Sequence, residues 1–399
     1  MHIAIFLDQH PESLGGVQTS VLNQKKYLEA QGHRVTLVSP HGRDKSVRDG
    51  FLLLPSWPIT PNREYAAILN PGRADWLIDK HFEMPENKVD VVHIQADFWG
   101  AILGLGFAKK HDLPTVMTVH TNVQVGTEKV LGGFFGGLFI RALSLALNIH
   151  LRILSLKTTT SAWEYVSRMA ERVDLVAAPS HHFAKQLMDN HIGQAVTVIQ
   201  NGVDDARINE VMDAVGNQSR EPRLIWSGRM LPEKRLLEFL EAVNLARPKA
   251  SVELVGSGPL EREARRFVEK HDLGHIVKFT GRVAYKEMLR ILAASDALVQ
   301  TSIGYETQGM TVFEAASVGT PSILCDKNIA GELPQDDYWL VADDSAEELA
   351  AAIMRAVADI ASGNAKRNDL KDREAFRQST LTAETVKLYD SLIAKNSPK

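Results

Sequence analysis

Short apolar runs alternate along this chain with longer segments in which apolar residues recur every three or four positions. The runs at His2 to Phe6 and at Val89 to Ile94 are typical of buried strands, and the longer segments are typical of helices that cover a sheet. The alternation continues to about Ile199 and begins again at Arg223. This pattern predicts an α/β protein built from two consecutive, doubly wound parallel sheets.

The sequence Asn201-Gly202-Val203-Asp204 separates the two series, and its asparagine and glycine are typical of a turn. A chain of 399 residues is also too long for one ordinary hydrophobic core. We therefore predict an N-terminal domain at residues 1–201, completed by a C-terminal helix at 380–399, and a C-terminal domain at 202–379.

Two features of the first half stand out from this alternation. Residues 51–82 are irregular and rich in proline, and we expect an ordered excursion that either lines an acceptor cleft or packs on its own domain. His120 follows the strand predicted at Thr115 to Val119, and ligands of open parallel sheets bind beyond the carboxyl ends of the strands. His120 is therefore placed for chemistry, with a structural histidine as the alternative.

The stretch from Glu128 to Lys157 is strongly apolar and contains sparse cations and a single acid. It includes Phe134, Phe135 and Arg141. One interpretation is a segment that lies in a membrane interface, with its apolar side chains down and its cations toward anionic headgroups. The other is a buried helical hairpin of a large domain, and the glycines of the stretch permit either arrangement.

Composition narrows the class of protein without choosing a function. Hydrophobic residues make up 44% of the chain and charged residues 24%, which is typical of a soluble globular protein. The formal net charge of -4 does not suggest nucleic acid as a partner, and the single Cys325 excludes an internal disulfide framework and a multi-cysteine metal site. The N-terminus lacks the features of a signal peptide, and no apolar run is long enough to span a bilayer. We expect a cytoplasmic protein.

Glycines occur where predicted strands meet predicted helices. Gly15-Gly16 precedes the first helix, and Gly256-Ser257-Gly258-Pro259 follows the strand at Val252 to Val255. Glycine lets the backbone approach a ligand closely, and a helix N-terminus attracts anions. The turn at Gly15-Gly16 is therefore either part of an anion site or a tight turn without a ligand.

The most informative stretch runs from Glu306 to Pro321 and carries two carboxylates, Glu306 and Glu314, eight positions apart. Gly309 stands at the predicted start of a helix, and Gly319 stands at its end. Strands are predicted on both sides, so the acids lie at the mouth of a helix that connects two strands. Taken alone, the stretch is either a ligand site or one more βα unit with solvated acids.

Together these motifs resemble the retaining glycosyltransferases of family 4, and the resemblance covers nearly the whole chain. Its most specific element is the pair of acids with seven residues between them, followed by small residues and Gly-x-Pro. The shorter matches are Gly15-Gly16-Val17, Val119-His120-Thr121, Asn201-Gly202-Val203-Asp204, Gly228-Arg229 with Lys234, and Gly256-Ser257-Gly258-Pro259. The resemblance implies the GT-B fold, in which two Rossmann-like doubly wound parallel-sheet domains face each other across a cleft.

Two departures from the common family pattern narrow the acceptor. Thr307-Gln308-Gly309-Met310 stands where most members have Ser-Phe-Gly-Leu, and Glu233-Lys234 is followed by Arg235 rather than by the commoner glycine. Both departures are similar to members that glycosylate diacylglycerol-type lipids. The resemblance thus implies a hexosyltransferase that acts on a membrane lipid and is peripheral at the inner face of the membrane.

The resemblance also assigns roles at the donor and at the transferred sugar. The diphosphate leaving group of a nucleotide sugar gains negative charge, and the chain has no Asp-x-Asp sequence to hold a divalent metal. Protein cations and helix amides must then meet this charge, so neither a metal nor a cofactor is expected. The implied catalytic residues are His120, beside the sugar, and Glu306, on its hydroxyls. The implied donor-binding residues are Gly15, Gly16, Arg229, Lys234, Val283 near the base, Gly309, Met310, Thr311, and Glu314 on the ribose.

The sequence leaves more than one interpretation for the donor and for the acceptor. Tyr285 stands where some guanine-recognising members have an acid, which favours a UDP-sugar over a GDP-sugar. A lipid acceptor at the membrane, contacted by Phe134, Phe135 and Arg141, competes with a soluble sugar or polysaccharide acceptor. A non-catalytic nucleotide-sugar-binding protein is a further alternative. No nucleophile is assigned, because front-face attack with the leaving phosphate as base is the favoured mechanism in retaining members of this fold.

Overall fold

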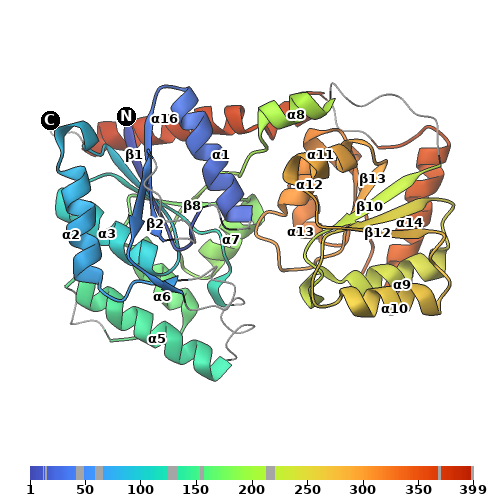
Figure 1. Cartoon of the computed structure of the whole chain (residues 1–399), viewed down its shortest axis with the longest axis horizontal. Helices are drawn as coiled ribbons and strands as arrows, with labels where there is room; N and C mark the ends of the chain where they lie inside the picture. The colour runs from blue at the N-terminus through green and yellow to red at the C-terminus, as the bar shows by residue number, and fades with distance from the viewer. Residues whose placement is uncertain are drawn as a thin grey trace. The chain divides into compact units, whose positions relative to one another are not determined.

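The structure is a computed structural model that describes residues 1–11, 13, 16–41, 49–58, 66–124, 133–152, 157–212, 221–366 and 370–396. Gly15 and parts of the apolar stretch at 128–157 lie outside the described residues. The chain forms two compact units (Figure 1). Unit 1 comprises Met1–Gln200 with Leu381–Lys399, and unit 2 comprises Asn201–Thr380.

Unit 1 is built on a parallel sheet with the strand order β3-β2-β1-β6-β7-β8-β9. The order reverses beside β1, which pairs with β2 on one side and with β6 on the other, as in doubly wound sheets. Every residue of β1 is buried, because helices cover both faces of the sheet. The strands are β1 (His2–Leu7), β2 (Arg34–Pro40), β3 (Phe51–Leu54), β6 (Val91–Gln95), β7 (Thr115–Thr118), β8 (Leu175–Ala178) and β9 (Val196–Val198), and β4 (Trp57–Pro58) and β5 (Ala66–Ala67) form a separate antiparallel pair.

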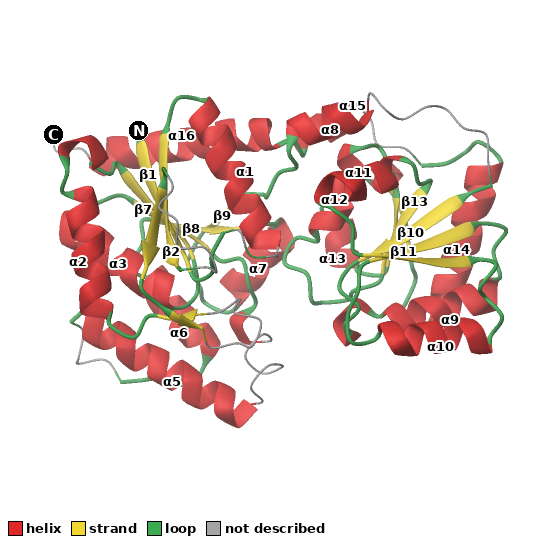
Figure 2. Cartoon of the chain, viewed as in Figure 1, coloured by secondary structure: helices red, strands yellow, loops and turns green. Residues whose placement is uncertain are grey.

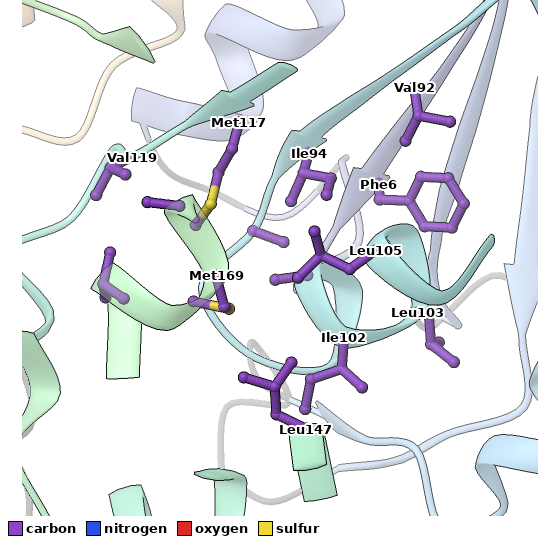
Figure 3. Close-up of a cluster of buried hydrophobic side chains, with 14 of the residues drawn as sticks. Phe6, Val92, Ile94, Ile102, Leu103, Leu105, Met117, Val119, Leu147 and Met169 are labelled. Atoms are coloured by element: carbon purple, nitrogen blue, oxygen red, sulfur yellow. The ribbon is translucent and has the colours of Figure 1, made fainter. Parts of the chain in front are cut away.

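The helices of unit 1 enclose this sheet (Figure 2). Figure 3 shows Phe6, Val92 and Ile94 of the sheet packed beside the side chains of α3, with Leu147 of α5 and Met169 of α6 in the same cluster. One continuous core therefore joins α5 to the sheet through α3. The helices are α1 (Gly16–Ala30), α2 (Pro71–Phe82), α3 (Trp99–His111), α5 (Gly133–His150), α6 (Ala162–Ala170), α7 (His181–Asp189) and α16 (Gln378–Asn396), with a 3-10 turn at Pro85–Asn87.

The C-terminal helix α16 packs on unit 1 at the face of the sheet that carries Ile3 and Ile5. Its buried Tyr389 has its hydroxyl 2.6 Å from Nδ1 of His93 on β6, and Nε2 of His93 is 2.7 Å from the hydroxyl of Thr118 on β7. Burial lowers the pKa of His93 to about 3, so this ring is neutral at pH 7. His93 is thus a satisfied structural histidine that ties α16 to two strands.

Unit 2 repeats the design on a second parallel sheet, with the strand order β12-β11-β10-β13-β14-β15 and a reversal beside β10. This architecture confirms the predicted fold class. Its strands are β10 (Arg223–Ser227), β11 (Ser251–Val255), β12 (Val277–Gly281), β13 (Ala297–Gln300), β14 (Ser322–Leu324) and β15 (Tyr338–Leu340). Its helices are α8 (Asp205–Met212), α9 (Leu236–Ala246), α10 (Glu261–Lys270), α11 (Tyr285–Ala293), α12 (Met310–Ser317), α13 (Lys327–Ala330), α14 (Ala346–Ala361) and α15 (Leu370–Ala375), with 3-10 turns at Pro232–Lys234 and Gln335–Asp337.

The prediction of an irregular excursion at residues 51–82 is wrong at both ends. Phe51–Leu54 forms β3 at the edge of the sheet, and Pro71–Phe82 forms the helix α2. Asn70 caps this helix by accepting the backbone amide of Arg73 at 2.9 Å, and proline fits the first helical position because it needs no amide partner there. The asparagine–proline pair is therefore a helix start, whereas the high proline content of the segment had suggested an irregular loop.

Candidate active site

The loops that follow β10 and β11 meet at the carboxyl edge of the unit 2 sheet. Gly256 has a φ of +129°, and a Cβ atom there would lie 1.9 Å from the carbonyl oxygen of Gly228. A Cβ atom on Gly258 would lie 2.6 Å from the carbonyl oxygen of Met230. Because both contacts are to backbone, only glycine fits at these two positions. The two glycine-bearing loops therefore pack directly against each other.

Lys234 and Glu306 form an ion pair between the turn after β10 and the loop before α12. Both side chains reach solvent, with exposures of 22% and 16%, and the Lys234 ammonium also lies 5.8 Å from the ring centroid of Tyr305. Burial raises the pKa of Tyr305, and the charge of the exposed Arg229 opposes this rise. Two cations are thus available to an anionic ligand at this edge.

The helix α12 begins directly after this loop. Gly309 is its N-cap and has a φ of +83°, a left-handed conformation that glycine adopts without strain. The amides of Gly309, Met310 and Thr311 belong to the first turn, where an α-helix offers its amides no carbonyl partner four residues back. Such amides, together with the helix dipole, favour an anion.

Glu314 lies further along α12 and, unlike Glu306, is buried. Burial raises the pKa of Glu314 to about 7, and the neighbouring Tyr285 hydroxyl lowers it in part. Tyr285 begins α11, and Val283, in the loop before α11, packs against the same hydrophobic cluster as Tyr285. The two acids of the motif therefore differ. Glu306 is paired with a cation near the surface, and Glu314 is a buried group that is about half protonated at pH 7.

His120 lies just beyond the carboxyl end of β7 in unit 1 and is buried. Its Nε2 atom is 2.9 Å from Oε1 of Gln95, and Nε2 of Gln95 donates to Oε1 of Gln24 at 2.6 Å. This second bond orients the Gln95 amide with its oxygen toward His120, which makes Nε2 of His120 the donor. Burial lowers the pKa of His120 to about 4. At pH 7 the ring is therefore neutral, and Nδ1 is its hydrogen-bond acceptor.

Two acids of unit 1, the half-buried Asp8 and the buried Asp97, are not among the residues that the sequence motifs select. Asp8 follows β1 and accepts the backbone amides of Asp97 at 2.6 Å, Phe98 at 2.8 Å and Gly100 at 2.8 Å, where α3 begins. Burial, and then the charge of Asp8, raises the pKa of Asp97 to about 8. Oδ1 of Asp97 makes no hydrogen bond within the described part of the chain. Both acids, like His120, lie just beyond the carboxyl end of a strand. The sequence signal that points to His120 could therefore also have identified them.

The membrane-interface prediction falls on α5, a single helix from Gly133–His150 in unit 1. Within the described residues this stretch is one helix with a buried face and an exposed face, so the structure contains no buried hairpin there. The exposed face carries Arg141 and large apolar side chains. These are Phe134 (76% exposed), Phe135 (67%), Leu138 (47%), Leu145 (49%) and Ile149 (57%). Across the described ranges, no helix has the length and apolarity that crossing a bilayer requires.

The predicted site residues form two sets in different units. Unit 2 holds Glu306 and the predicted donor-binding residues other than Gly15 and Gly16, with Lys234 and Glu306 in direct contact. Unit 1 holds His120, the residues of α5, and Gly16, the exposed first residue of α1. Gly15 lies outside the described residues. Among the residues that the structure describes, no group of three or more histidine, cysteine or acidic side chains is arranged to hold a metal ion.

Two families match consecutive parts of the chain. Residues 14–207 match the family described as Glycosyltransferase Family 4, and residues 208–375 match the family described as Glycosyl transferases group 1. The chain is 24% identical to the alpha-monoglucosyldiacylglycerol synthase of Acholeplasma laidlawii over 100% of this chain and 99% of that protein. It is also 24% identical to the protein of the same name from Streptococcus pneumoniae, over 90% of this chain and 78% of that protein.

Solved structures share the fold along the whole chain. Sucrose-phosphate synthase from Thermosynechococcus elongatus superposes with a TM-score of 0.72 at 19% identity, over 99% of both chains. HepE of Anabaena in complex with UDP-glucose superposes with a TM-score of 0.68 at 18% identity, over 98% of this chain and 100% of the other. At these identities the likeness shows the fold, which is that of two Rossmann-like parallel-sheet domains.

Proposed function

We propose that this chain, which belongs to glycosyltransferase family 4 and has the GT-B fold, moves a hexose from a nucleotide-sugar donor to a membrane lipid. The acceptor class is diacylglycerol or a glycolipid. Two relatives named alpha-monoglucosyldiacylglycerol synthase match this chain over nearly its whole length, which supports a lipid acceptor. The reaction is a retaining transfer that needs no metal.

The single observation that carries the proposal is the ion pair between Lys234, in the turn after β10, and Glu306, in the loop that precedes α12. A nucleotide sugar presents a diphosphate beside sugar hydroxyls, and this edge offers a cation beside a hydrogen-bond acceptor. Lys234 and Arg229 meet the charge that grows on the diphosphate as the glycosidic bond breaks. The amides of Gly309, Met310 and Thr311 add fixed dipoles, so the charge is met without a metal.

The two acids of the motif take different parts of the donor. Glu306, held by Lys234, accepts hydrogen bonds from hydroxyls of the transferred hexose. Glu314 accepts hydrogen bonds from the ribose, and because hydrogen bonds to a carboxylate favour its charged form, the bound ribose keeps this acid ionised. The backbone near Val283 receives the base. Tyr285, an uncharged side chain at this place, favours uridine over guanine.

His120 and Gly16 act from unit 1 on the same reaction. The neutral imidazole of His120 contacts the transferred sugar and positions it. Because the ring is uncharged, it does not repel the positive charge of the oxocarbenium-like transition state. Gly16 admits the diphosphate close to the start of α1. No nucleophile is assigned, because the leaving phosphate takes the acceptor proton on the face that it departs from. The hexose therefore keeps its anomeric configuration.

The acceptor is reached at a membrane surface by the exposed face of α5. Phe134 and Phe135 insert between lipids, and Arg141 remains at the level of the headgroups. Cations near a membrane are attracted to the anionic lipids of the cytoplasmic leaflet, which places the protein peripherally at the inner face of the membrane. A diacylglycerol hydroxyl is then available without the lipid having to leave the bilayer.

A panel of UDP- and GDP-sugars, each mixed with vesicles that contain diacylglycerol and anionic phospholipid, tests the donor half of this proposal. We expect the wild type to release nucleoside diphosphate from one of these donors. Glu306→Gln removes the charge that faces the sugar hydroxyls, and we expect release to fall about 10²- to 10³-fold with the fold intact. The matched control is Glu269→Gln, at the exposed end of α10, which keeps the wild-type rate. Absence of release with every donor would favour the non-catalytic nucleotide-sugar-binding protein.

A further inference from the structure

Gln308 lies between Glu306 and α12 and is only 2% exposed. Its side-chain amide pairs with Asn201 through three hydrogen bonds. Oε1 of Gln308 accepts from the backbone amide of Asn201 at 3.0 Å and from its side-chain Nδ2 at 2.6 Å. Nε2 of Gln308 donates to the backbone carbonyl of Asn201 at 3.0 Å. Both hydrogen-bonding atoms of the Gln308 side chain are therefore used on a residue that is more than one hundred positions away.

Asn201 is the first residue of unit 2 and begins one of two segments that lie next to the points where the chain passes between the units. These segments, residues 201–205 and 376–379, are bonded to each other and are called the connector here. Val203 donates its amide to the carbonyl of Phe376 at 2.9 Å, and Gln378 donates its amide to the carbonyl of Val203 at 2.9 Å. A Cβ atom on Gly202 would lie 2.6 Å from Cα of Gln378, so glycine is required where the segments touch. The Gln308 amide is thus bonded to a part of unit 2 that adjoins both points where the chain passes between the units.

We propose that Gln308 is a positioning residue that couples the occupied donor site to the connector. The proposal rests on the function proposed above, because it needs the loop 306–311 to bind the donor. A donor that fixes Glu306 and the first amides of α12 restricts the loop on both sides of Gln308. The paired amides transmit this restriction to Asn201, and by thermodynamic reciprocity a fixed connector strengthens donor binding.

The chemistry of the pair explains why the coupling is strong. Asn201 is 6% exposed, so its backbone amide and carbonyl have little access to water when Gln308 is lost. Buried groups that lose a partner pay their full desolvation cost, and the loop then relaxes to recover hydrogen bonds. Gln308→Met keeps the length of the side chain and removes all three bonds. Of the three bonds with Gln308, Asn201→Ala removes the one from Nδ2 and keeps the two to the Asn201 backbone.

The test measures nucleotide affinity and amide exchange in the full-length protein, with UDP and GDP as probes. In the wild type, we expect the bound nucleotide to slow hydrogen–deuterium exchange both at 306–314 and in the connector peptides. In Gln308→Met, we expect the dissociation constant to rise about tenfold and the nucleotide to protect only 306–314. Asn201→Ala is expected to show a smaller rise, about twofold to threefold, and partial loss of connector protection.

The matched control is Ser295→Ala, which removes a buried hydrogen bond of 2.7 Å to the carbonyl of Ile291 at the end of α11. It is expected to lower the melting temperature without changing nucleotide affinity or connector protection. If Gln308→Met melts earlier but keeps wild-type affinity and connector protection, the residue is only structural and the proposal is overturned. If Gln308→Met does not fold, the same comparison is made with Asn201→Ala, where wild-type values for both readouts overturn it. A wild type that binds neither UDP nor GDP refutes the proposed function itself, which is a different outcome.

Discussion

The two units carry opposite kinds of polar site at the carboxyl edges of sheets of the same design. In unit 2, Lys234 and Glu306 are paired and reach solvent. In unit 1, burial lowers the pKa of His120 to about 4 and raises that of Asp97 to about 8, so both are mainly uncharged at pH 7. One scaffold therefore offers an ion pair that reaches solvent in unit 2 and a mainly uncharged histidine and acid in unit 1, and the difference lies in how deeply these side chains are buried.

This difference matches the two halves of the proposed reaction. A diphosphate needs cations and amides that stay accessible, and unit 2 provides them beside glycine loops too tight for any other residue. A transferred sugar and a lipid hydroxyl carry no charge, and the uncharged imidazole of His120 in unit 1 suits them as a hydrogen-bonding group. The comparison predicts that removing a charge in unit 2 lowers the reaction rate most. It also predicts that pH changes the free energy of unfolding most strongly through unit 1.

Removing the cation of unit 2 gives the largest expected effect. Lys234→Met removes the ion pair with Glu306 and, in the proposed donor complex, one of the cations at the diphosphate, so we expect kcat/KM for the donor to fall about 10³-fold. The measurement is the rate of nucleoside diphosphate release as donor concentration is varied. Lys270→Met, an exposed cation at the end of α10, is the matched control and should behave as wild type. A loss of less than tenfold would show that the charged site does not meet the leaving group.

The exposed face of α5 gives the next largest effect. Phe134→Asp with Phe135→Asp replaces two exposed rings by carboxylates that anionic lipids repel, so we expect binding to anionic vesicles to fall about 10²-fold. Sedimentation with vesicles measures this binding. Leu245→Asp with Met354→Asp changes two exposed apolar residues of unit 2 and should leave binding unchanged. Equal binding by the α5 variant, or a wild type that binds no vesicles, would favour the soluble acceptor.

The buried acid of unit 1 gives the smallest effect, and it depends on pH. Because the pKa of Asp97 is raised to about 8, the folded state holds a proton that the unfolded state releases near pH 4. Its contribution to stability is therefore largest at low pH and is lost as pH rises through about 8. Asn at this position does not titrate, so Asp97→Asn should gain roughly 2 kcal/mol of unfolding free energy relative to wild type between pH 6 and pH 9.

Urea unfolding at the two pH values measures this change for Asp97→Asn. Glu171→Gln, at the exposed end of α6, serves as the control, and its difference from wild type should be the same at both values. If the Asp97→Asn difference is also the same at both values, Asp97 is ionised in the folded protein and the site of unit 1 is not neutral.

The fold was predictable because the spacing of apolar residues and the ends of the strands can be recognised in the sequence. Short apolar runs, separated by segments with helical periodicity, correctly predict the positions of β1 and β10. The predicted end of β7 likewise places His120 just beyond this strand, where ligands of parallel sheets bind. The segment at Asn70 and Pro71 was misread because its proline content outweighed a helix-start signal. Proline directly after an N-cap residue fits the first helical position, so an asparagine–proline pair can also mark a helix start.

The properties of the site were less predictable because they depend on burial and on distant partners. Nothing in the order of residues says that Glu314 is buried while Glu306 is paired with Lys234. The sequence motif gives Gln308 meaning only for the acceptor class, because its partner Asn201 is one hundred and seven positions away, beyond any local pattern. Such contacts appear only when the sheet of unit 2 brings its loops together.

The central claim is that the hexose is transferred to a membrane lipid with retention of configuration. The most direct test incubates the wild type with the donor that it accepts and with vesicles that contain diacylglycerol, and then examines the lipid fraction by mass spectrometry and NMR. The account predicts a lipid that is heavier by one hexose and has the anomeric configuration of the donor. A hexose found only on water or on added soluble sugars, or a lipid product of inverted configuration, would contradict it.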